Sequence, residues 1–529
     1  MSKRIVAAIL SLVLLTGFFC IPTAAQDDTL EIHPELEKVY SLLDNSTMKA
    51  FANALYEGMR LHQTTISMSD YHLRFNNADE ISEALQLLCD YLYFYVPELF
   101  SVDFFSTYRM RYRTVSGKVE VTSVYNITYT CSQAQAELYL AQYKKELRKI
   151  VNYVSGKGLT DTQKIIAVHD YFVAHYEYDL DYLIYDAVTF FREKKGVCSA
   201  YTNAFFAVMQ RLGIVSYVVT DNIHAHAWNI VKIGSNYYHV DCTNDDPSPD
   251  GYGMVPSRHE LLLTTDSRIM EHHIDYFGEV EYPDPADPEG ENMLLWTGDE
   301  PCWQVAGLDN VVCNSNTFEN APWHESDYPI AICNGVGYML VDTGDDSSIT
   351  TASYRKAEIN RLNSGWMSAS LVTTVSSPAW RAPSNNSIWD NFYSGFFAVG
   401  NRLYLNCSNQ LWSYSVTDHT VQTIPRSHSD QMYGCLYAGK GVIQYCTKSR
   451  DGINDENGLE YEYSMPEIGD ANGDEQVTAS DLVGLRVYLL VGTVGNTHPD
   501  FFDVTGDYSI DITDLIHMKK YVAGDIDSF

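Results

Sequence analysis

The spacing of apolar residues divides this chain of 529 residues into stretches with different predicted secondary structure. Apolar residues recur at helical spacing over 78–96 and 132–154, whereas apolar and polar residues alternate over 107–130. Helical runs mixed with strand-like alternation predict an α+β region over residues 27–150.

The pattern of residues 151–281 predicts a second α+β domain. Directly after Cys198, apolar residues recur at helical spacing, so we expect a helix that begins at this cysteine. Two β-rich runs, 225–233 and 236–243, are separated by a short turn at Gly234 and Ser235, which predicts a β-hairpin.

Short strands and turns dominate residues 295–463, where aromatic-rich hairpins recur at uneven intervals. This pattern predicts a β-rich domain, either propeller-like or a sandwich. Its Trp and Tyr side chains could bind carbohydrate or protein, but aromatic residues of this kind more often fill β cores. The Pro- and acid-rich stretch 282–294 is predicted to be a linker.

Three polar residues of the second domain have local contexts that suit cysteine catalysis. Cys198 lies in GVCSAY, His226 in HAHAWN and Asp241 in YYHVDCTNDDP. A thiol needs a base to become a thiolate, and the base needs a third group that holds its ring in the right tautomer. A helix N-terminus also favours a thiolate. We therefore predict a catalytic triad of Cys198, His226 and Asp241, with the backbone N–H of Cys198 as one oxyanion donor.

These motifs resemble those of the transglutaminase-like superfamily, whose pattern is G-V-C, then H-A-W-N, then D-x-T-x-x-D-P. The resemblance covers roughly residues 150–265, and one departure is Asn244, where an aromatic residue is more usual. It implies a papain-like core and a thioester intermediate. It does not distinguish hydrolysis of an amide from transfer to an amine.

The C-terminal segment contains an internal repeat, in which a loop from Asp470 aligns with a loop from Asp503. In both loops, oxygen-bearing side chains fall at the positions that ligate Ca²⁺ in a calcium loop, and an apolar helix follows. The predicted calcium ligands are Asp470, Asn472, Asp474, Gln476, Asp481, Asp503, Thr505, Asp507, Ser509 and Asp514.

A duplicated calcium loop and helix resembles a type I dockerin, here over residues 466–529. The resemblance implies a small all-α domain, two Ca²⁺ ions and a cohesin domain of a scaffoldin as the partner. The position usually occupied by Gly holds Glu475 and Tyr508, which puts the loop geometry in question. By alignment, the cohesin contacts are Ala479, Ser480, Arg486, Ile512, Thr513, Lys519 and Lys520.

The N-terminus and the charge indicate an exported protein. Lys3 and Arg4 precede an apolar run and a small-residue site, which predicts a signal peptide over 1–25 and no membrane span. The formal net charge of −34 argues against nucleic acid as a partner, because phosphates would be repelled. The 11 cysteines show no CxxC pair, so their spacing neither supports a zinc site nor settles whether disulfides form.

Together, these features predict a secreted, scaffold-docked cysteine peptidase or amidase, with no cofactor for catalysis and a protein or peptide substrate. Alternatives are a protein-crosslinking transglutaminase and a non-catalytic subunit that binds protein or carbohydrate in a cellulosome-like complex. A carbohydrase is the least favoured reading, because no carboxylate pair stands out among the acidic residues.

Overall fold

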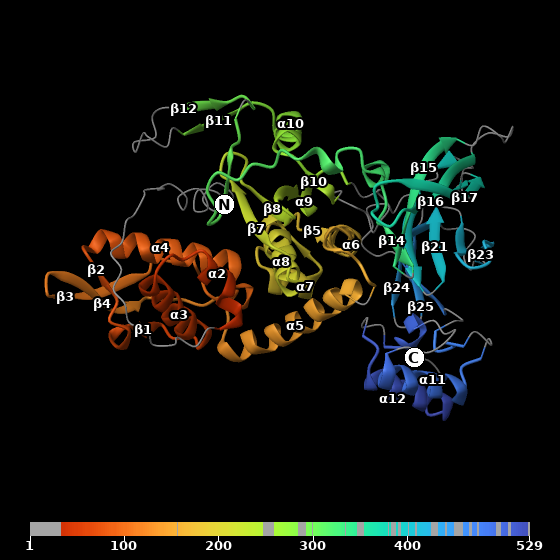
Figure 1. Ribbon diagram of the computed structural model, residues 1–529, viewed down its shortest axis with the longest axis horizontal. Coiled ribbons are helices and arrows are strands. Elements are labelled where there is room, and N and C mark those ends of the chain that lie inside the picture. Colours follow the sequence, from red (N-terminus) through yellow and green to blue (C-terminus); the bar gives the residue numbers. More distant parts are fainter. Residues whose placement is uncertain are drawn as a thin grey trace. The chain divides into compact units, whose positions relative to one another are not determined.

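The computed structural model contains helices and several separate β-sheets, and the chain forms two compact units that are each discontinuous in sequence (Figure 1). The first unit comprises residues 1–147, 179–241 and 263–315, and the second 148–178, 242–262 and 316–529. The structure describes residues 33–155, 157–246, 259–283, 293–298, 300–333, 335–345, 354–378, 380–381, 388–389, 393–399, 401–407, 410–424, 432–439, 442–448, 459–464, 468–472, 476–492, 499–505 and 509–526. The predicted signal peptide and most of the predicted linker lie outside these ranges.

The N-terminal part of the first unit packs three helices and a small antiparallel sheet around one hydrophobic core. Its elements are α2 (Glu37–Ser41), α3 (Ser46–Arg60), β1 (Thr65–Ser67), β2 (Arg74–Phe75), α4 (Ala78–Tyr95), β3 (Arg109–Val115) and β4 (Lys118–Tyr125). Asn77 starts α4, because its side chain accepts the backbone N–H of Glu80 at 2.9 Å. The predicted α+β mixture of this region is therefore confirmed.

The remainder of the first unit is an antiparallel sheet beside helix α8, and the candidate site lies here (Figure 1). The strand order is β10-β9-β8-β7-β13. The elements are α7 (Ala187–Glu193), β6 (Lys195–Gly196), α8 (Cys198–Arg211), β7 (Ser216–Asp221), β8 (His226–Ile233), β9 (Asn236–Val240), β10 (Leu262–Thr264), α10 (Asp266–Phe277), β11 (Val280–Pro283), β12 (Met293–Trp296) and β13 (Trp303–Val305). Both the helix starting at Cys198 and the β8–β9 hairpin are confirmed.

The two parts of the first unit share buried residues. Phe206 of α8 and Val218 of β7 belong to the same hydrophobic core as the N-terminal helices. The Tyr95 hydroxyl of α4 donates to the carbonyl of Ala306 at 2.6 Å and accepts the N–H of Val218 at 3.3 Å. The N-terminal region is therefore packed directly on the sheet and helix that carry the candidate site.

The second unit contains α6, the β-rich region and the two C-terminal helices. Its described elements are α6 (Asp161–His175), α9 (Cys242–Asp245), β14 (Ala331–Cys333), β15 (Val336–Asp345), β16 (Tyr354–Leu362), β17 (Ala369–Pro378), β18 (Trp380–Arg381), β19 (Ile388–Trp389), β20 (Tyr393–Val399), β21 (Arg402–Cys407), β22 (Leu411–Ser415), β23 (Val421–Ile424), β24 (Met432–Gly439), β25 (Val442–Lys448), β26 (Leu459–Ser464), α11 (Ala479–Val491) and α12 (Ile512–Val522). The short β5 (Glu177–Tyr178) and the long α5 (Gln133–Ser155) border or cross the division between units.

The β-rich region is built from antiparallel sheets whose strands follow one another in chain order. The three largest are β14-β15-β16-β17, β20-β21-β22-β23 and β24-β25-β26. Leu340, Ile359, Leu403, Leu405 and Trp412 are among the apolar side chains buried in this region. Strands therefore dominate the described residues from 331 to 464, and many of their aromatic and apolar side chains are core, whereas the earlier β13 belongs to the sheet of the first unit.

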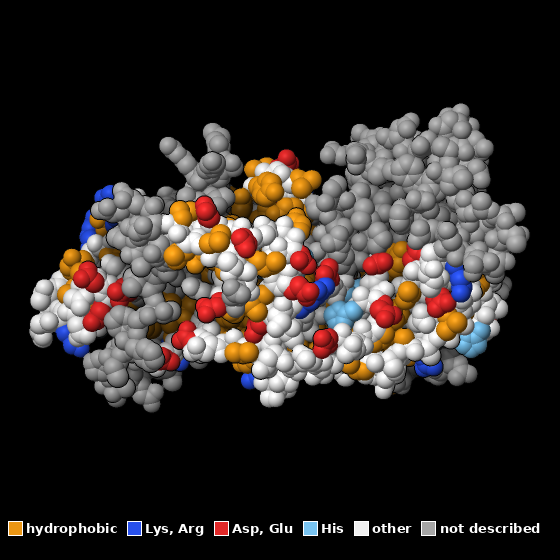
Figure 2. Space-filling view, turned by 90° about the horizontal axis from the view of Figure 1, so that it is seen from above, with side chains coloured by type: hydrophobic (Ala, Val, Ile, Leu, Met, Phe, Trp, Pro, Cys, Tyr) orange, Lys and Arg blue, Asp and Glu red, His pale blue; other side chains and the backbone are white. Residues whose placement is uncertain are grey.

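The described surface agrees with the acidic composition. On the face shown in Figure 2, Lys and Arg are scattered among Asp and Glu, and do not form a band across the described part of that face. Among the helices that the structure describes, none is both long and apolar enough to cross a membrane.

Candidate functional site

Cys198 is the first residue of α8 and is partly exposed. Val197 has an extended backbone, and its carbonyl accepts the N–H groups of Ala200 at 2.9 Å and Tyr201 at 3.2 Å, which starts the helix. The first N–H groups of a helix have no intrahelical partner, so they are directed towards the space in front of the thiol. This confirms the predicted position of the cysteine at a helix N-terminus.

His226 links the thiol to Asp241. The His226 Nε2 lies 2.7 Å from Oδ2 of Asp241, and a hydrogen bond joins the imidazole to the Cys198 thiol. His226 is the first residue of β8 and Asp241 directly follows β9, so the hairpin brings them side by side. Burial would lower the pKa of His226, but the Asp241 carboxylate and the Cys198 thiol raise it well above its usual value.

Asn229 connects the helix that carries Cys198 to the hairpin that carries His226. Its side-chain amide donates to the carbonyl of Thr202 in α8 at 3.2 Å, and to the carbonyl of Tyr217 in β7 at 3.4 Å. Thr202 in turn donates from its hydroxyl to the carbonyl of Cys198 at 2.7 Å. The Asn of the HAWN motif therefore ties β8, which begins at His226, to α8, which begins at Cys198.

Trp228 stacks on the ring of His226. The two rings stack with centroids 5.4 Å apart and an interplanar angle of 23°. The indole Nε1–H donates to Nδ1 of His239 at 2.8 Å, and His239 Nε2 donates to Asp266 at 2.8 Å. Because His239 accepts at Nδ1, it is the neutral Nε2–H tautomer. His239 therefore positions Trp228.

A short loop, residues 179–186, runs beside the thiol. The carbonyl of Ile184 accepts the N–H of Val197 at 2.9 Å, and the carbonyl of Tyr185 accepts the Ser199 hydroxyl at 3.0 Å. Buried Asp179 organises this loop by accepting the N–H groups of Leu183 and Ile184 at 2.8 and 3.0 Å. Burial would raise the pKa of Asp179, but these N–H groups and a lysine lower it.

The loop leaves three large apolar side chains in solvent. Leu180 and Tyr182 are each 58% exposed and Leu183 is 74% exposed. Tyr93 of α4 is within hydrogen-bonding reach of Ser199 and close enough to Cys198 for an electrostatic interaction. The thiol is therefore bordered by this loop and by a residue of the N-terminal region.

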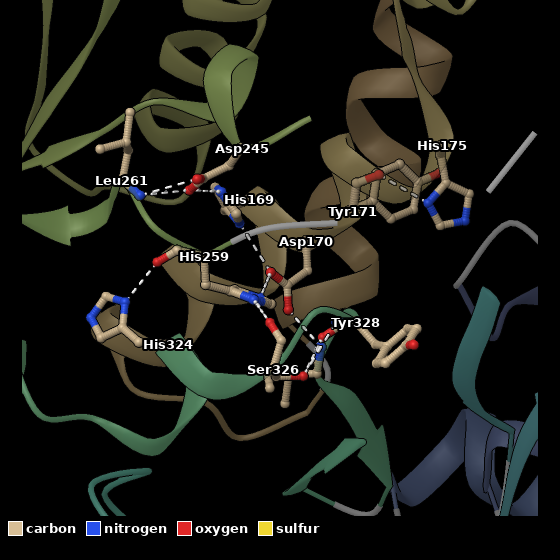
Figure 3. Close-up of polar contacts among 11 residues, drawn as sticks. His169, Asp170, Tyr171, His175, Asp245, His259, Leu261, His324, Ser326 and Tyr328 are labelled. Carbon is tan, nitrogen blue, oxygen red and sulfur yellow. Dashed lines mark hydrogen bonds and ion pairs between the residues drawn. The ribbon is translucent and has the colours of Figure 1, made fainter. Parts of the chain in front are cut away.

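A second polar cluster lies in the other unit and has a different character (Figure 3). His169 of α6 lies 3.0 Å from Asp170 through Nδ1 and 3.1 Å from Asp245 through Nε2. His259 lies 2.8 Å from the same Asp170 through Nε2, and its Nδ1 donates to the carbonyl of Ser326 at 2.6 Å. Every ring nitrogen of these two buried histidines is hydrogen-bonded, which is typical of a structural polar core.

Two carboxylates determine the charge of His169. Asp170 and Asp245 only accept when ionised, so both ring nitrogens of His169 must carry protons. Burial would lower the pKa of His169, but the two carboxylates raise it to about 9. Asp170 also accepts the N–H of Ile330 at 2.6 Å and Asp245 accepts the N–H of Leu261 at 3.0 Å. The imidazolium therefore joins α6 to α9 and to the segments at 259–261 and 326–330.

The two C-terminal loops have equivalent hydrogen bonds at their last predicted ligand. Buried Asp481 accepts the N–H groups of Ala471 at 3.1 Å and Asn472 at 3.3 Å. Buried Asp514 accepts the N–H and the hydroxyl of Thr505, each at 3.1 Å. Both carboxylates thus point back into their loops, as calcium ligation requires. The structure describes eight of the predicted ligands, and Asp474 and Asp507 lie outside the described residues.

The predicted partner contacts lie at the surface. All seven are exposed, on α11 for Ala479, Ser480 and Arg486 and on α12 for Ile512, Thr513, Lys519 and Lys520. The exposed side of α11 also carries apolar residues at helical spacing, namely Val483 at 57%, Val487 at 40% and Leu490 at 83% exposed. Exposed apolar side chains in such a row are typical of an interaction surface.

Comparison with protein families agrees with this geometry. Residues 148–242 match the transglutaminase-like superfamily. Residues 468–523 match the type I dockerin domain, a family that typically binds calcium and whose partner is a cohesin. No curated protein matches the chain. The family resemblance inferred from the motifs is confirmed for both domains.

Two solved structures are similar to part of the chain. One is described as a TGase, at 16% identity, a TM-score of 0.18, and coverage of 26% of this chain and 44% of the other. The second is described as a "putative cysteine protease from Cytophaga hutchinsonii", at 16% identity, a TM-score of 0.18, and coverage of 27% and 64%. The chain therefore spans less than two thirds of the length of either structure.

The sequence did not indicate several residues that position the catalytic side chains or border the thiol. Asp179, His239 and Asp266 carry no motif of their own, and each acts through a neighbour that only folding supplies. Tyr93 lies more than a hundred residues before the thiol, on a helix whose apolar period predicted burial alone. Its position near the thiol depends on the packing of α4 against α8, which no local pattern in the sequence shows.

Proposed function

We propose that this chain is an exported cysteine hydrolase that cleaves peptide or side-chain amide bonds and docks on a cohesin-bearing scaffold. The observation that carries the enzymatic part is the hydrogen-bonded series from Asp241 through His226 to Cys198 at a helix N-terminus. A dead domain or a pure binding module would have no need to keep a thiol, a base and an orienting acid in this order.

The reaction follows from this geometry. His226 takes the proton of Cys198, and the thiolate attacks the amide carbonyl carbon. The N–H groups at the start of α8, with that of Cys198 first, donate to the oxyanion. His226 then gives its proton to the leaving amine as the C–N bond breaks, which leaves a thioester. Water, deprotonated by His226, hydrolyses the thioester and restores the thiol.

Asp241 has the role of orienting acid in this scheme. It bonds to Nε2 of His226, which leaves Nδ1 as the ring nitrogen that faces the thiol. A buried carboxylate at this position holds the tautomer and stabilises the imidazolium that forms when the thiol ionises.

The surroundings of the thiol favour a protein substrate. Leu180, Tyr182 and Leu183 are exposed on a loop that Asp179 holds rigid beside Cys198. Apolar side chains of a peptide would gain burial against these three residues. Hydrolysis is the expected outcome because the thiol is partly exposed and water can reach the thioester.

The remaining modules supply attachment. We propose two Ca²⁺ ions, one in each C-terminal loop, with the ten predicted ligands, and a cohesin bound along the exposed faces of α11 and α12. The predicted signal peptide would direct export. For the β-rich region we propose a propeller-like arrangement, because each of its three largest sheets is an antiparallel meander of consecutive strands, as in a propeller blade. The domain boundaries given above from the sequence remain part of this proposal.

The decisive experiment is mass spectrometry of a mixed protein pool incubated with the full chain and a labelled primary amine. Wild type is compared with Cys198→Ala, and with Cys131→Ala as the matched control, since Cys131 is also partly exposed. We expect new protein N-termini, or Gln converted to Glu, in wild type and in Cys131→Ala but not in Cys198→Ala.

Two other results would change the conclusion. Amine label on glutamine that depends on Cys198 would make the protein a crosslinking transglutaminase. Identical products from wild type and Cys198→Ala across a broad pool would refute a cysteine enzyme and favour a non-catalytic binding subunit.

A further inference from the structure

Four side chains with metal-binding atoms converge close to His226, in the first unit. Asp221 ends β7, His224 lies in the turn to β8, His273 is on α10, and Cys302 directly precedes β13. One atom of each lies within 4.8 Å of the other three. We propose that Asp221, His224, His273 and Cys302 bind a structural Zn²⁺ ion.

The separations of these atoms resemble the edges of a tetrahedral zinc site. Zinc bonds of about 2.3 Å to sulfur and about 2.0–2.1 Å to nitrogen or oxygen imply ligand–ligand separations of roughly 3.3–3.6 Å. The sulfur of Cys302 lies 3.7 Å from Nδ1 of His224 and 3.9 Å from Nδ1 of His273. The Asp221 Oδ2 lies 3.4 Å from Nδ1 of His273.

Two separations are shorter than a tetrahedron requires, and both involve Asp221. Its Oδ2 lies 2.5 Å from Nδ1 of His224 and 3.0 Å from the sulfur of Cys302. A displacement of this carboxylate oxygen by less than about 1 Å would open both edges to the expected length. The other oxygen of Asp221 accepts the N–H of Ile223 at 2.8 Å, which keeps Oδ2 directed at the three other groups.

The two buried imidazoles of this cluster face it through one ring nitrogen each. The side chains of Asp221, His224 and His273 are at most 1% exposed. Nε2 of His224 and Nε2 of His273 have no hydrogen-bond partner among the described residues. By contrast, the rings of His169, His239 and His259 are bonded through both nitrogens. Among these five histidines, His224 and His273 make their polar contacts within the cluster through Nδ1 alone, which is the nitrogen that would bind the ion.

The donor set selects zinc. One thiolate, two imidazoles and one carboxylate combine soft and borderline ligands, which suit Zn²⁺ better than Ca²⁺ or Mg²⁺. Four protein ligands complete a tetrahedron and leave no position for a reacting water, so the site is structural. It is separate from the proposed calcium loops and does not depend on the proposed cysteine chemistry.

The proposed ion would lie next to the candidate active site and would stabilise the segments around it. It would join the β7–β8 turn, α10 and the segment before β13, which are separated in sequence by up to 81 residues. The His273 ring lies edge-on to His226 with centroids 6.2 Å apart, and edge-on to Trp228 at 5.3 Å. Zinc would thus fix a residue whose ring packs against the proposed catalytic base.

The test uses the full chain without a histidine tag, freed of metal and titrated with Co²⁺ and then with Zn²⁺. We expect about one Co²⁺ per chain with the visible absorption of a tetrahedral ion and a thiolate charge-transfer band, and displacement by Zn²⁺. If folded wild type binds neither ion at this stoichiometry, the proposal is overturned. This outcome is measured on wild type alone.

Variants then assign the site. Cys302→Ser should lose the charge-transfer band and His273→Gln should reduce bound zinc from about one equivalent to near zero. Cys313→Ser is the matched control, because Cys313 belongs to another His–Asp–Cys group, with His239 and Asp266. Retention of the band in Cys302→Ser, or its loss in Cys313→Ser alone, would overturn the assignment. Circular dichroism of each metal-free variant separates loss of binding from loss of folding.

Discussion

The stability of the second unit should fall as the pH rises from about 6.5 to 9, because His169 is held as an imidazolium. Its ring bonds to Asp170 and Asp245, and its pKa is raised to about 9 in the folded protein. The unfolded value is near 6.5. A group whose folded pKa is raised stabilises the fold fully below its unfolded pKa, and this stabilisation is lost as the pH passes through the folded pKa.

The magnitude follows from the difference between the two pKa values. A difference of roughly 2.5 units corresponds to about 3 kcal/mol between the two protonation states. His169 is fully buried, so solvent does not screen its interaction with the two carboxylates. Between pH 6.5 and 9 the loss should approach about 1.4 kcal/mol per pH unit.

Hydrogen exchange of the α6 amides is the appropriate assay, because it reports the opening of one element in a chain with several domains. Rates are corrected for the intrinsic effect of pH and converted to opening free energies at pH 6.5, 7.5 and 8.5. His169→Gln is the comparison, since Gln keeps hydrogen-bonding capacity but has no proton to lose in this range. Burial raises the pKa of thiols such as those of Cys89 and Cys313, and their contribution is the same in both proteins.

The expected result is an α6 opening free energy that decreases with pH in wild type and is nearly constant in His169→Gln. His259 also faces Asp170, so His259→Gln shows how much of the slope belongs to the second ring. Equal slopes in wild type and His169→Gln would refute the assignment of an imidazolium to His169.

Three further predictions concern the thiol, its orienting acid and the C-terminal module. Iodoacetamide at slightly acidic pH, where ordinary thiols barely react, should alkylate wild type and not Cys198→Ala, as peptide mapping would show; equal labelling of both would mean that another thiol is the reactive one. Asp241→Asn should lower kcat for a cleaved peptide by about 10²- to 10⁴-fold with little change in KM, because the tautomer of His226 is no longer held. A rise in KM with unchanged kcat would contradict this role. Removal of Ca²⁺ should lower the melting temperature of the α11–α12 module and abolish cohesin binding, and Asp481→Ala should produce part of the same loss. Alkylation of Cys198 should stay unchanged, and a parallel loss of alkylation would show that the modules are coupled.

Much of the fold was predictable because its elements are encoded by local patterns. The helix beginning at Cys198, the hairpin at Gly234 and the strands of residues 295–463 each follow from apolar period and turn residues within a short window. The site residues Cys198, His226 and Asp241 were recognisable for the same reason, since each lies in a motif of a few residues. The two proposed calcium loops repeat the spacing of their predicted ligands along the chain, so they too could be identified from the sequence.

What the sequence alone determined about this protein is therefore the identity of its local elements, its two motif-bearing domains and its overall charge. Only the tertiary structure decided which distant side chains meet. His169 with Asp245, His239 with Asp266, and Asp221 with His273 and Cys302 lie tens of residues apart, and no periodic pattern links them. Buried polar groups must find partners wherever packing brings them, and that packing depends on the whole core and not on any local stretch of sequence.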